Sequence, residues 1–249
     1  MKILNPNWIV GFVDGNGHFG FSNNTFYFVV SQDHRSVNVL YAIKSFFKCG
    51  SVHKAGGCSP RSGGNMLEYR VSSKTHLENI IIPFFQKWCL QTSKKKSFEL
   101  FVKNFNPSLN SVTNLNFSNC NNLNLDWLIG FIDAEGCFVC SIINRTIRPQ
   151  FVIGLNEIDK NILDKIQQYL NCGVRFKRKN RVEIFQLSSN SSMYYFAKHV
   201  LLTKGFDDRL KTYKRIRARK WCKIILLMEQ KKHKTIDGFN KIKKLYTSF

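Results

Sequence analysis

The sequence predicts an α+β fold built from two similar halves. Two segments that begin at Trp8 and Trp127 carry nearly the same residues, and each is an apolar run that ends in a polar residue followed by glycine. After each run the apolar residues change from helical spacing to alternation, which is typical of a helix followed by a strand. A repeat at this distance indicates two copies of one folded unit.

The repeat can be followed almost to the end of each half, which predicts the order αββαββα for both. The later matching segments are 28–30 with 151–153, 47–50 with 170–173, 69–73 with 185–189, and 90–95 with 210–215. Between the halves, residues 106–124 hold eight Asn, one Pro and no charged residue, a composition typical of a linker. We therefore expect one domain at 1–105, a linker at 106–124 and a second domain at 125–249.

The first helix of each half has recognisable ends and one face of small residues. Pro6 or Asn7 is expected to begin the first helix, and Asp126 to cap the second. The small residues lie four apart: Gly11 and Gly15 in the first helix, Gly130 and Ala134 in the second. Small residues at this spacing let two helix backbones pack closely. Such packing would bring residues 16 and 135, at the helix ends, to one shared spot.

The segments after each helix predict antiparallel strands with one apolar and one polar face. In the first half, the expected inward residues are Phe19 and Phe21, and those opposite are His18, Ser22 and Asn24. In the second half, the expected inward residues are Phe138, Cys140, Ile142, Phe151 and Ile153, and those opposite are Arg148, Gln150 and Val152. Sheets with one apolar face against helices leave the other face free for a partner. A polar, basic β-ribbon fits the major groove of DNA, where Arg, Lys, Asn and Gln reach distinguishable base edges.

The predicted polar faces supply the candidate nucleic-acid contacts. These are Ser22, Asn24, His53, Lys54, Arg61 and Arg70 in the first half, and Arg148, Gln150, Arg175, Lys177, Lys179, Arg181 and Gln186 in the second. Arg61 lies in a Gly-rich loop, 56–64, which has the composition of a hairpin tip. A phosphate-cradling loop is the alternative for this segment, but the sequence around it lacks the strand, loop and helix of a GxxxxGK pattern.

The net charge of the chain is +22, which predicts a polyanionic partner. Residues 125–249 hold 25 of the 38 basic side chains and 11 of the 16 acidic ones. An ordinary solvated basic surface and a membrane surface are the weaker alternatives; for the second, the apolar stretch 224–228 is far too short to span a bilayer. Nucleic acid is therefore the expected partner, with no membrane.

Cysteine spacing disfavours a zinc site, and overall composition favours an organelle gene. Cys137 and Cys140 have the spacing of zinc ligands, but on a strand they point to opposite faces, and no second pair or His cluster accompanies them. Richness in Asn, Lys, Ile and Phe indicates an AT-rich genome. We therefore expect synthesis in a mitochondrion or plastid, with no signal or transit peptide before the first helix.

Segments 9–17 and 128–136 both resemble the signature of the LAGLIDADG homing endonucleases. The resemblance implies a monomer with an internal pseudo-dimer. Each half would hold a saddle-shaped antiparallel sheet covered by helices on one face, and the signature helices would pack at the interface between the halves. It also implies a long double-stranded DNA site, which the two diverged halves would make asymmetric, and hydrolysis of phosphodiesters there with Mg²⁺.

In this family the penultimate acidic residue of each signature binds the catalytic divalent metal, and the corresponding residues here are Asn16 and Glu135. Glu135 fits the pattern, whereas Asn16 offers an oxygen to Mg²⁺ without a charge. Three explanations are consistent with Asn16: an enzyme that cuts poorly or nicks one strand, a former endonuclease kept for nucleic-acid binding, or an introduced change. The second includes an RNA-binding role, as in an intron maturase or an organellar ribosome component, in which the basic C-terminal helix would follow an RNA backbone.

The repeated Leu-x-Thr-x-Lys supplies one candidate catalytic lysine in each half, Lys94 and Lys214. A lysine near the metal would stabilise the charge that develops on the phosphate during hydrolysis. Neighbouring basic residues in both runs are close substitutes for either lysine. Gln32 and Asn156, at the ends of the second strands, are expected to position water.

Overall fold

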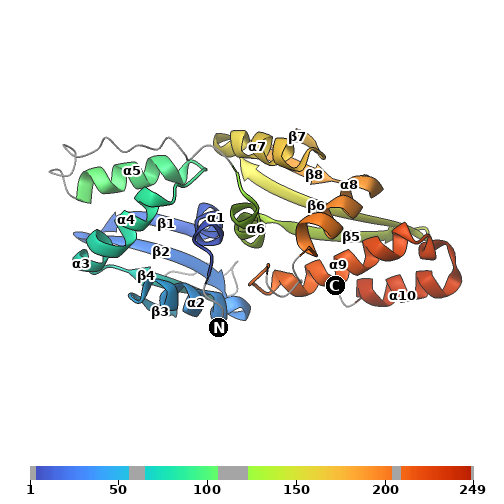
Figure 1. Cartoon of the computed structure of the whole chain (residues 1–249), viewed down its shortest axis with the longest axis horizontal. Helices are drawn as coiled ribbons and strands as arrows, with labels where there is room; N and C mark the ends of the chain where they lie inside the picture. Colours follow the sequence, from blue (N-terminus) through green and yellow to red (C-terminus); the bar gives the residue numbers. More distant parts are fainter. Residues whose placement is uncertain (1–3, 56–64, 106–122, 204–208, 248–249) are drawn as a thin grey trace. The chain divides into compact units, whose positions relative to one another are not determined.

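The computed structural model describes residues 4–55, 65–105, 123–203 and 209–247 (Figure 1). The chain divides into two compact units, Met1–Ala134 and Glu135–Phe249. The Gly-rich loop that contains Arg61 and all but the last two residues of the expected linker lie outside the described residues. Within the described ranges, no helix is long and apolar enough to cross a membrane.

The first unit contains one four-stranded antiparallel sheet with the strand order β1-β2-β4-β3. Its elements are α1 (Pro6–Asn16), β1 (Gly17–Ser22), β2 (Thr25–Asp33), the 3-10 helix η1 (His34–Ser36), α2 (Val37–Phe47), β3 (Ser51–Lys54), β4 (Met66–Val71), α3 (Lys74–His76), the π-helix η3 (Leu77–Ile81), α4 (Ile82–Lys87) and α5 (Lys94–Phe105). The signature helix α6 (Leu125–Glu135) also belongs to this unit as far as Ala134.

The second unit repeats the same sheet, with the order β5-β6-β8-β7. Its elements are β5 (Cys137–Ile143), β6 (Thr146–Asn156), the 3-10 helix η5 (Glu157–Asp159), α7 (Lys160–Leu170), β7 (Val174–Arg178), β8 (Val182–Leu187), α8 (Asn190–Tyr195), the π-helix η6 (Phe196–Leu201), α9 (Lys214–Glu229), the 3-10 helix η8 (Lys232–Lys234) and α10 (Ile236–Thr247). The α+β class and the two similar halves are confirmed.

Each signature helix is capped by an asparagine that stands before the residues expected to start it. The Asn5 side chain accepts from the Asn7 backbone N–H at 2.8 Å, and Pro6 is the first helical residue. In α6 the Asn124 side chain accepts from the Trp127 N–H at 2.9 Å. The expected start of the first helix at Pro6 is therefore confirmed, whereas the expected cap of the second, Asp126, was wrong by two residues. The side-chain oxygen of a capping Asn accepts from one of the free N–H groups in the first turn of the helix.

Aromatic rings fill the space between the first sheet and its helices. The Phe19 ring of β1 lies 5.0 Å from Phe28, 5.2 Å from Phe85 and 5.0 Å from Phe98, measured between centroids. All four side chains are buried. Truncation of a buried Phe costs about 3–5 kcal/mol. The cluster therefore fixes β1, and with it the chain directly after α1.

In the second unit the inward residue Phe138 packs on Phe151 at 5.1 Å and on Trp221 of α9 at 5.6 Å. Phe21 lies on the same face as Phe19, as expected, but its side chain is 57% exposed. Phe21 lies next to the turn that ends β1, where the Phe26 ring covers one side of it at 4.5 Å. Burial of the apolar face thus ends before the strand does.

Three turns join neighbouring strands of the two sheets. Asn23-Asn24 and Asn144-Arg145 are two-residue turns, whereas three residues, 179–181, join β7 to β8. All of these turn residues except Lys179 have φ between 47° and 66°. Positive φ at both positions is typical of the type I′ hairpin turn, and Asn tolerates it better than most residues. The expected contact residues Asn24 and Arg181 therefore lie at hairpin tips.

Candidate functional site

The signature helices α1 and α6 touch backbone to backbone at their middle glycines. A Cβ atom on Gly11 would lie 2.0 Å from the Trp127 carbonyl oxygen, and one on Gly130 would lie 2.1 Å from the Trp8 carbonyl oxygen. Real Cβ atoms do not approach an oxygen so closely, so both positions require glycine. Gly15 and Ala134 are half-buried residues of the last turns. The small residues therefore form the helix contact at Gly11 and Gly130.

The two helices run in the same direction. At their N-terminal ends, the Asn5 side chain donates to the Asp126 carboxylate at 2.9 Å. The glycine contacts follow in the middle of both helices. Asn16 and Ala134 therefore lie on the same side of the pair, and Glu135 directly follows Ala134. The side chains of Asn16 and Glu135 are half-buried.

A buried carboxylate that the sequence reasoning missed stands two residues before Asn16. Asp14 accepts from the backbone N–H groups of Gln91 at 3.0 Å and Thr92 at 3.0 Å, from the Thr92 hydroxyl at 2.6 Å and from the Trp127 indole at 2.8 Å. Burial raises the pKa of Asp14 above its ordinary value, against the opposite effect of these hydrogen bonds. The signal in the sequence was the match with Asp133, which is also buried.

Lys94 places its ammonium group against the end of α1. Its Nζ donates to the Asp14 carbonyl oxygen at 2.9 Å and to the Gly15 carbonyl oxygen. The position follows from the motif, because the Thr92 hydroxyl accepts from the Lys94 N–H at 3.3 Å and starts α5 there. A cation is favourable at the C-terminal end of a helix. The lysine therefore lies beside the turn that ends in Asn16.

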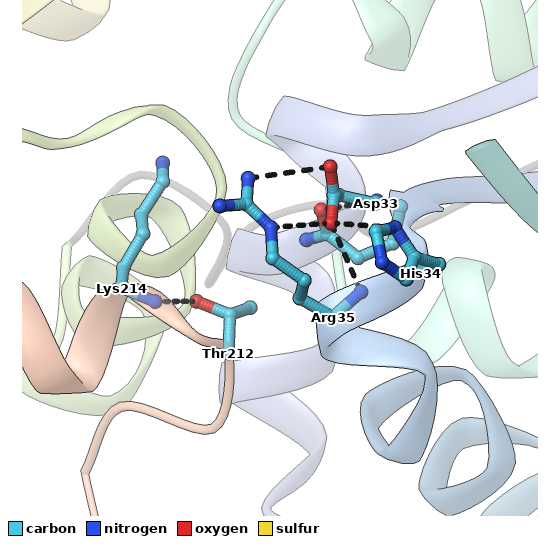
Figure 2. A network of polar contacts seen from close by, with 6 residues as sticks. Asp33, His34, Arg35, Thr212 and Lys214 are labelled. Carbon is cyan, nitrogen blue, oxygen red and sulfur yellow. Dashed lines mark hydrogen bonds and ion pairs between the residues drawn. The ribbon is translucent and has the colours of Figure 1, made fainter. Parts of the chain in front are cut away.

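The matching motif of the second unit builds the same helix start. The Thr212 hydroxyl accepts from the Lys214 N–H at 3.2 Å, at the first residue of α9 (Figure 2). Thr212 is buried, as Thr92 is in the first unit. The repeated Leu-x-Thr-x-Lys therefore encodes a capped helix whose first residue is the lysine.

The two residues expected to position water use their side-chain oxygens locally. Gln32 accepts from the Asp33 N–H at 2.8 Å, and Asn156 accepts from the Ile158 N–H at 3.1 Å as the cap of η5. In the first unit the equivalent cap is Asp33, which holds the Arg35 N–H at 2.9 Å (Figure 2). The hydrogen bond from Arg35 lowers the pKa of Asp33 below its ordinary value. Asp33, and not Gln32, is thus the counterpart of Asn156.

The open face of the first sheet is polar and aromatic. The strand register places His18, Tyr27, Ser31, His53, Glu68 and Arg70 on this face. These residues and Lys54 line a hollow of about 600 Å³. The guanidinium of Arg70 lies 4.1 Å above the centre of the Tyr27 ring. His53 and Arg70 therefore lie where the sequence placed them, whereas His18, Tyr27 and Glu68 were not among the candidates. Ser22 and Asn24 are exposed at the hairpin end of the same sheet.

The candidates Arg175 and Lys177 lie on the helix-covered side of the second sheet, which corrects their expected position. The register pairs Arg175 with the buried Phe185. Arg175 forms ion pairs with Asp164 and, at 3.2 Å, with Glu183. Lys177 forms an ion pair with Glu157 at 2.7 Å, which raises the pKa of Lys177 and lowers that of Glu157. Acidic residues of the same unit thus hold both cations.

The open face of the second sheet carries fewer charges and more apolar area than expected. The register places the candidates Arg148, Gln150 and Gln186 on this face together with Arg178, which the sequence reasoning left out. Lys179 and Arg181 are exposed at the β7–β8 turn. The same face exposes four large apolar side chains: Val139, Ile143, Val174 and Phe176. The two sheets therefore present different chemistry to a partner.

Among the described residues, no three His, Cys, Asp or Glu side chains come together as metal ligands. Cys137 is exposed and Cys140 is buried on opposite faces of β5. Asn16 ends α1 with an amide oxygen, and Glu135 ends α6 with a carboxylate. Oxygen donors suit a hard divalent cation, although one carboxylate binds it less strongly than two.

The model of the LAGLIDADG endonuclease family matches the chain at residues 9–105 and 128–225. Probable intron-encoded endonuclease 4 of Neurospora crassa is 28% identical over 238 residues, which cover 91% of this chain and 41% of that protein. A cox1 intron-2 37.2 kDa protein of Schizosaccharomyces pombe is 26% identical, over 95% of this chain and 70% of its own length. The chain thus spans less than half of the Neurospora relative.

Two solved structures share the fold over nearly their whole length. The meganuclease I-SmaMI, bound to uncleaveable DNA with a TTCT central four, has a TM-score of 0.81 and 24% identity, with 100% of this chain and 99% of that chain covered. The meganuclease I-AabMI, bound to uncleaved DNA, has a TM-score of 0.79 and 25% identity, with 97% and 98% covered. The family match extends over both halves and includes both signature helices, so the chain belongs to the LAGLIDADG endonuclease family.

Proposed function

We propose that the chain binds a long, asymmetric site in double-stranded DNA and hydrolyses phosphodiesters within it. The observation that carries the proposal is the reciprocal glycine contact of α1 and α6, with Lys94 held at the end of α1. This packing directs Asn16 and the end of α6 to the same side of the helix pair. A polar residue, a carboxylate and an ammonium group are thereby available for one reaction centre.

The open faces of the two sheets supply the proposed DNA contacts. A β-ribbon fits the major groove, where each base pair presents a distinct pattern of donors, acceptors and methyl groups. The first sheet offers Arg70, Glu68 and two histidines, whereas the second offers glutamines beside apolar side chains. Faces of different chemistry select different half-sites, so the whole site would be asymmetric. The relatives named as endonucleases and the structures bound to DNA favour DNA over the alternative RNA partner.

Glu135 and Asn16 would hold the divalent metal, which we propose to be Mg²⁺. When bound, such an ion lowers the pKa of a coordinated water and neutralises charge on the phosphate. The ammonium of Lys94, oriented by the Asp14 and Gly15 carbonyls, would stabilise negative charge on the same phosphate. Lys214 would act in the same way from the second unit. With Asn16 in place of an acid, we expect weak cleavage or nicking of one strand.

The gene would be an open reading frame in an organelle intron. A relative in Schizosaccharomyces pombe is a cox1 intron protein, and others are probable intron-encoded endonucleases. The richness in Asn, Lys, Ile and Phe agrees with an AT-rich mitochondrial genome. We therefore propose a mitochondrial protein.

Selection of bound sequences from random duplex DNA tests the proposed substrate. A long asymmetric consensus is expected, and a plasmid that carries it should be nicked or linearised only when Mg²⁺ is present. Binding should weaken steeply with salt, because each phosphate contact by Lys or Arg releases counterions. Tight binding to structured RNA with no duplex consensus would overturn the proposal.

A further inference from the structure

Residues 226–247 pack on the helix-covered side of the second sheet. The family model ends at residue 225, within α9. Beyond it, α10 packs through Ile242 on a buried cluster that includes Cys140 and Ile147 of the sheet and Leu227 of α9. The turn before α10 is tight, because a Cβ on Gly238 would lie 2.0 Å from the Lys232 carbonyl oxygen. Residues 226–247 therefore keep a fixed position on their own unit.

A basic hollow of about 730 Å³ lies between this addition and the β5–β6 hairpin tip. Its basic lining residues are Arg145 of the tip, His233 and Lys234 of η8, and Lys243 of α10. Asn240 adds an uncharged polar side chain, and no acidic side chain is among the described lining residues.

One side-chain nitrogen of the lining residue His233 makes no hydrogen bond to a described residue. It is the Nδ1 atom, which is buried. This atom is closed to solvent, so a ligand in the hollow would be held by the exposed cations around it. A phosphate group in the hollow would satisfy the surrounding cations.

We propose that this hollow binds a phosphodiester of the DNA that flanks the recognised site. The inference rests on the proposed function and extends it beyond the sheets. The tip that carries Arg145 is the far end of β5, which starts at Cys137, directly after the signature helix. Six residues of strand rise about 20 Å at about 3.3 Å each. This length corresponds to about six base pairs at about 3.4 Å each. A contact at this tip would therefore fall at the outer end of the base pairs that β5 covers.

The test compares duplexes that carry the selected site with either an extended or a trimmed flank on the side of the second unit. The proteins are the parent, the variant Lys234→Ala/Lys243→Ala, and the control Lys160→Ala/Lys198→Ala. The control removes the same charge from α7 and η6 of the same unit. All four lysines are exposed, so the fold should be kept, and circular dichroism checks this.

The parent should bind the extended duplex about tenfold more tightly than the trimmed one, and its log–log salt slope should be steeper by about two on the extended duplex. The Lys234→Ala/Lys243→Ala variant should lose both differences, while the control keeps them. Equal binding of both duplexes by the parent, or an equal loss in the control, would overturn this inference and leave the proposed function standing. Absence of any sequence-selective duplex binding by the parent would instead overturn the proposed function.

Discussion

The two signature helices share their packing and differ in their hydrogen bonds. Each glycine lies on the other helix's Trp carbonyl, at Cβ distances of 2.0 and 2.1 Å. Each Trp stacks on the Phe four residues later, at 4.9 and 4.8 Å with the same 15° tilt. The indoles nevertheless behave differently. Trp127 donates to Asp14 at 2.8 Å, whereas no described residue accepts from the buried Nε1 of Trp8.

The comparison shows that the two helices must keep the glycine contact, whereas a polar interaction can be present in one helix and absent from the other. A backbone contact at two glycines tolerates no side chain, so a change at either one disturbs both helices. A polar group at a helix end contributes less to stability, since an unsatisfied buried N–H costs about 1–3 kcal/mol. Asn16 is a second such difference, because it lacks the carboxylate that Glu135 has at the matching position. It affects the proposed chemistry and leaves the packing intact.

The largest expected effect is that of Asn16→Asp on cleavage. A second carboxylate should strengthen the proposed metal site and increase Mg²⁺-dependent cleavage by about a thousandfold, which corresponds to about 4 kcal/mol. The measurement counts nicked and linear products of a plasmid that carries the selected site. Asn7→Asp adds the same charge at the other end of α1 and serves as the control. No cleavage by parent or variant, with tight binding by both, would contradict the proposed centre.

The reverse change tests the other helix end. Glu135→Gln removes the remaining carboxylate and very little surface, so it should leave DNA affinity nearly unchanged and abolish any cleavage by the parent. Affinity is measured by titration with the labelled site, and cleavage on the same plasmid. Cleavage equal to that of the parent would rule out Glu135 as a metal ligand.

Gly11→Ala and Gly130→Ala should lower the free energy of unfolding by similar amounts, about 3 kcal/mol each, because both methyl groups would collide with a backbone oxygen. Denaturant unfolding measures both losses. Gly154→Ala is the control, since its methyl would lie 3.1 Å from the movable end of the Ile184 side chain. A large loss at only one signature glycine would break the equivalence of the two helices.

Replacement of each indole by phenyl isolates the difference in hydrogen bonding. Trp127→Phe and Trp8→Phe lose similar buried volume, but only the first removes a donor from Asp14. The free energy of unfolding should therefore fall by about 1–2 kcal/mol more for Trp127→Phe. Equal losses in the two variants would show that the Asp14 contact contributes nothing.

The smallest expected effect is a pH dependence of stability from Asp14. Burial raises its pKa in the folded chain, so its contribution is complete below the unfolded pKa near 3.8 and is lost as pH rises through the folded value. Asp14→Asn should remove this decline from the plot of unfolding free energy against pH. Asp33→Asn is the matched control, because the pKa of Asp33 is lowered and its contribution is lost as pH falls below about 3.8. If the unfolding free energy of Asp14→Asn still declines as pH rises, the decline comes from another group.

The repeat predicted the element order and the placement of the paired residues, because helical and alternating spacings are local properties of the sequence. The facing of β7 was not predictable in this way. Arg175, Lys177 and Arg178 are all basic, so the charges alone did not show which face each one takes. The answer depends on Asp164 and Glu157, which approach from other elements and hold two of the three. Asp14 was missed for a similar reason, since its donors come from residues 91, 92 and 127.

The glycine contact has a consequence for how such a chain can arise. Gly11 lies on Trp127 and Gly130 lies on Trp8. The contact surface of the signature helix is therefore complementary to a copy of itself. Two identical halves would dock through it as well as two diverged ones. A duplicated half-gene therefore needs no new interface to make a working chain. After duplication, a residue outside this contact can change in one half alone, and residues 16 and 135 differ between the halves.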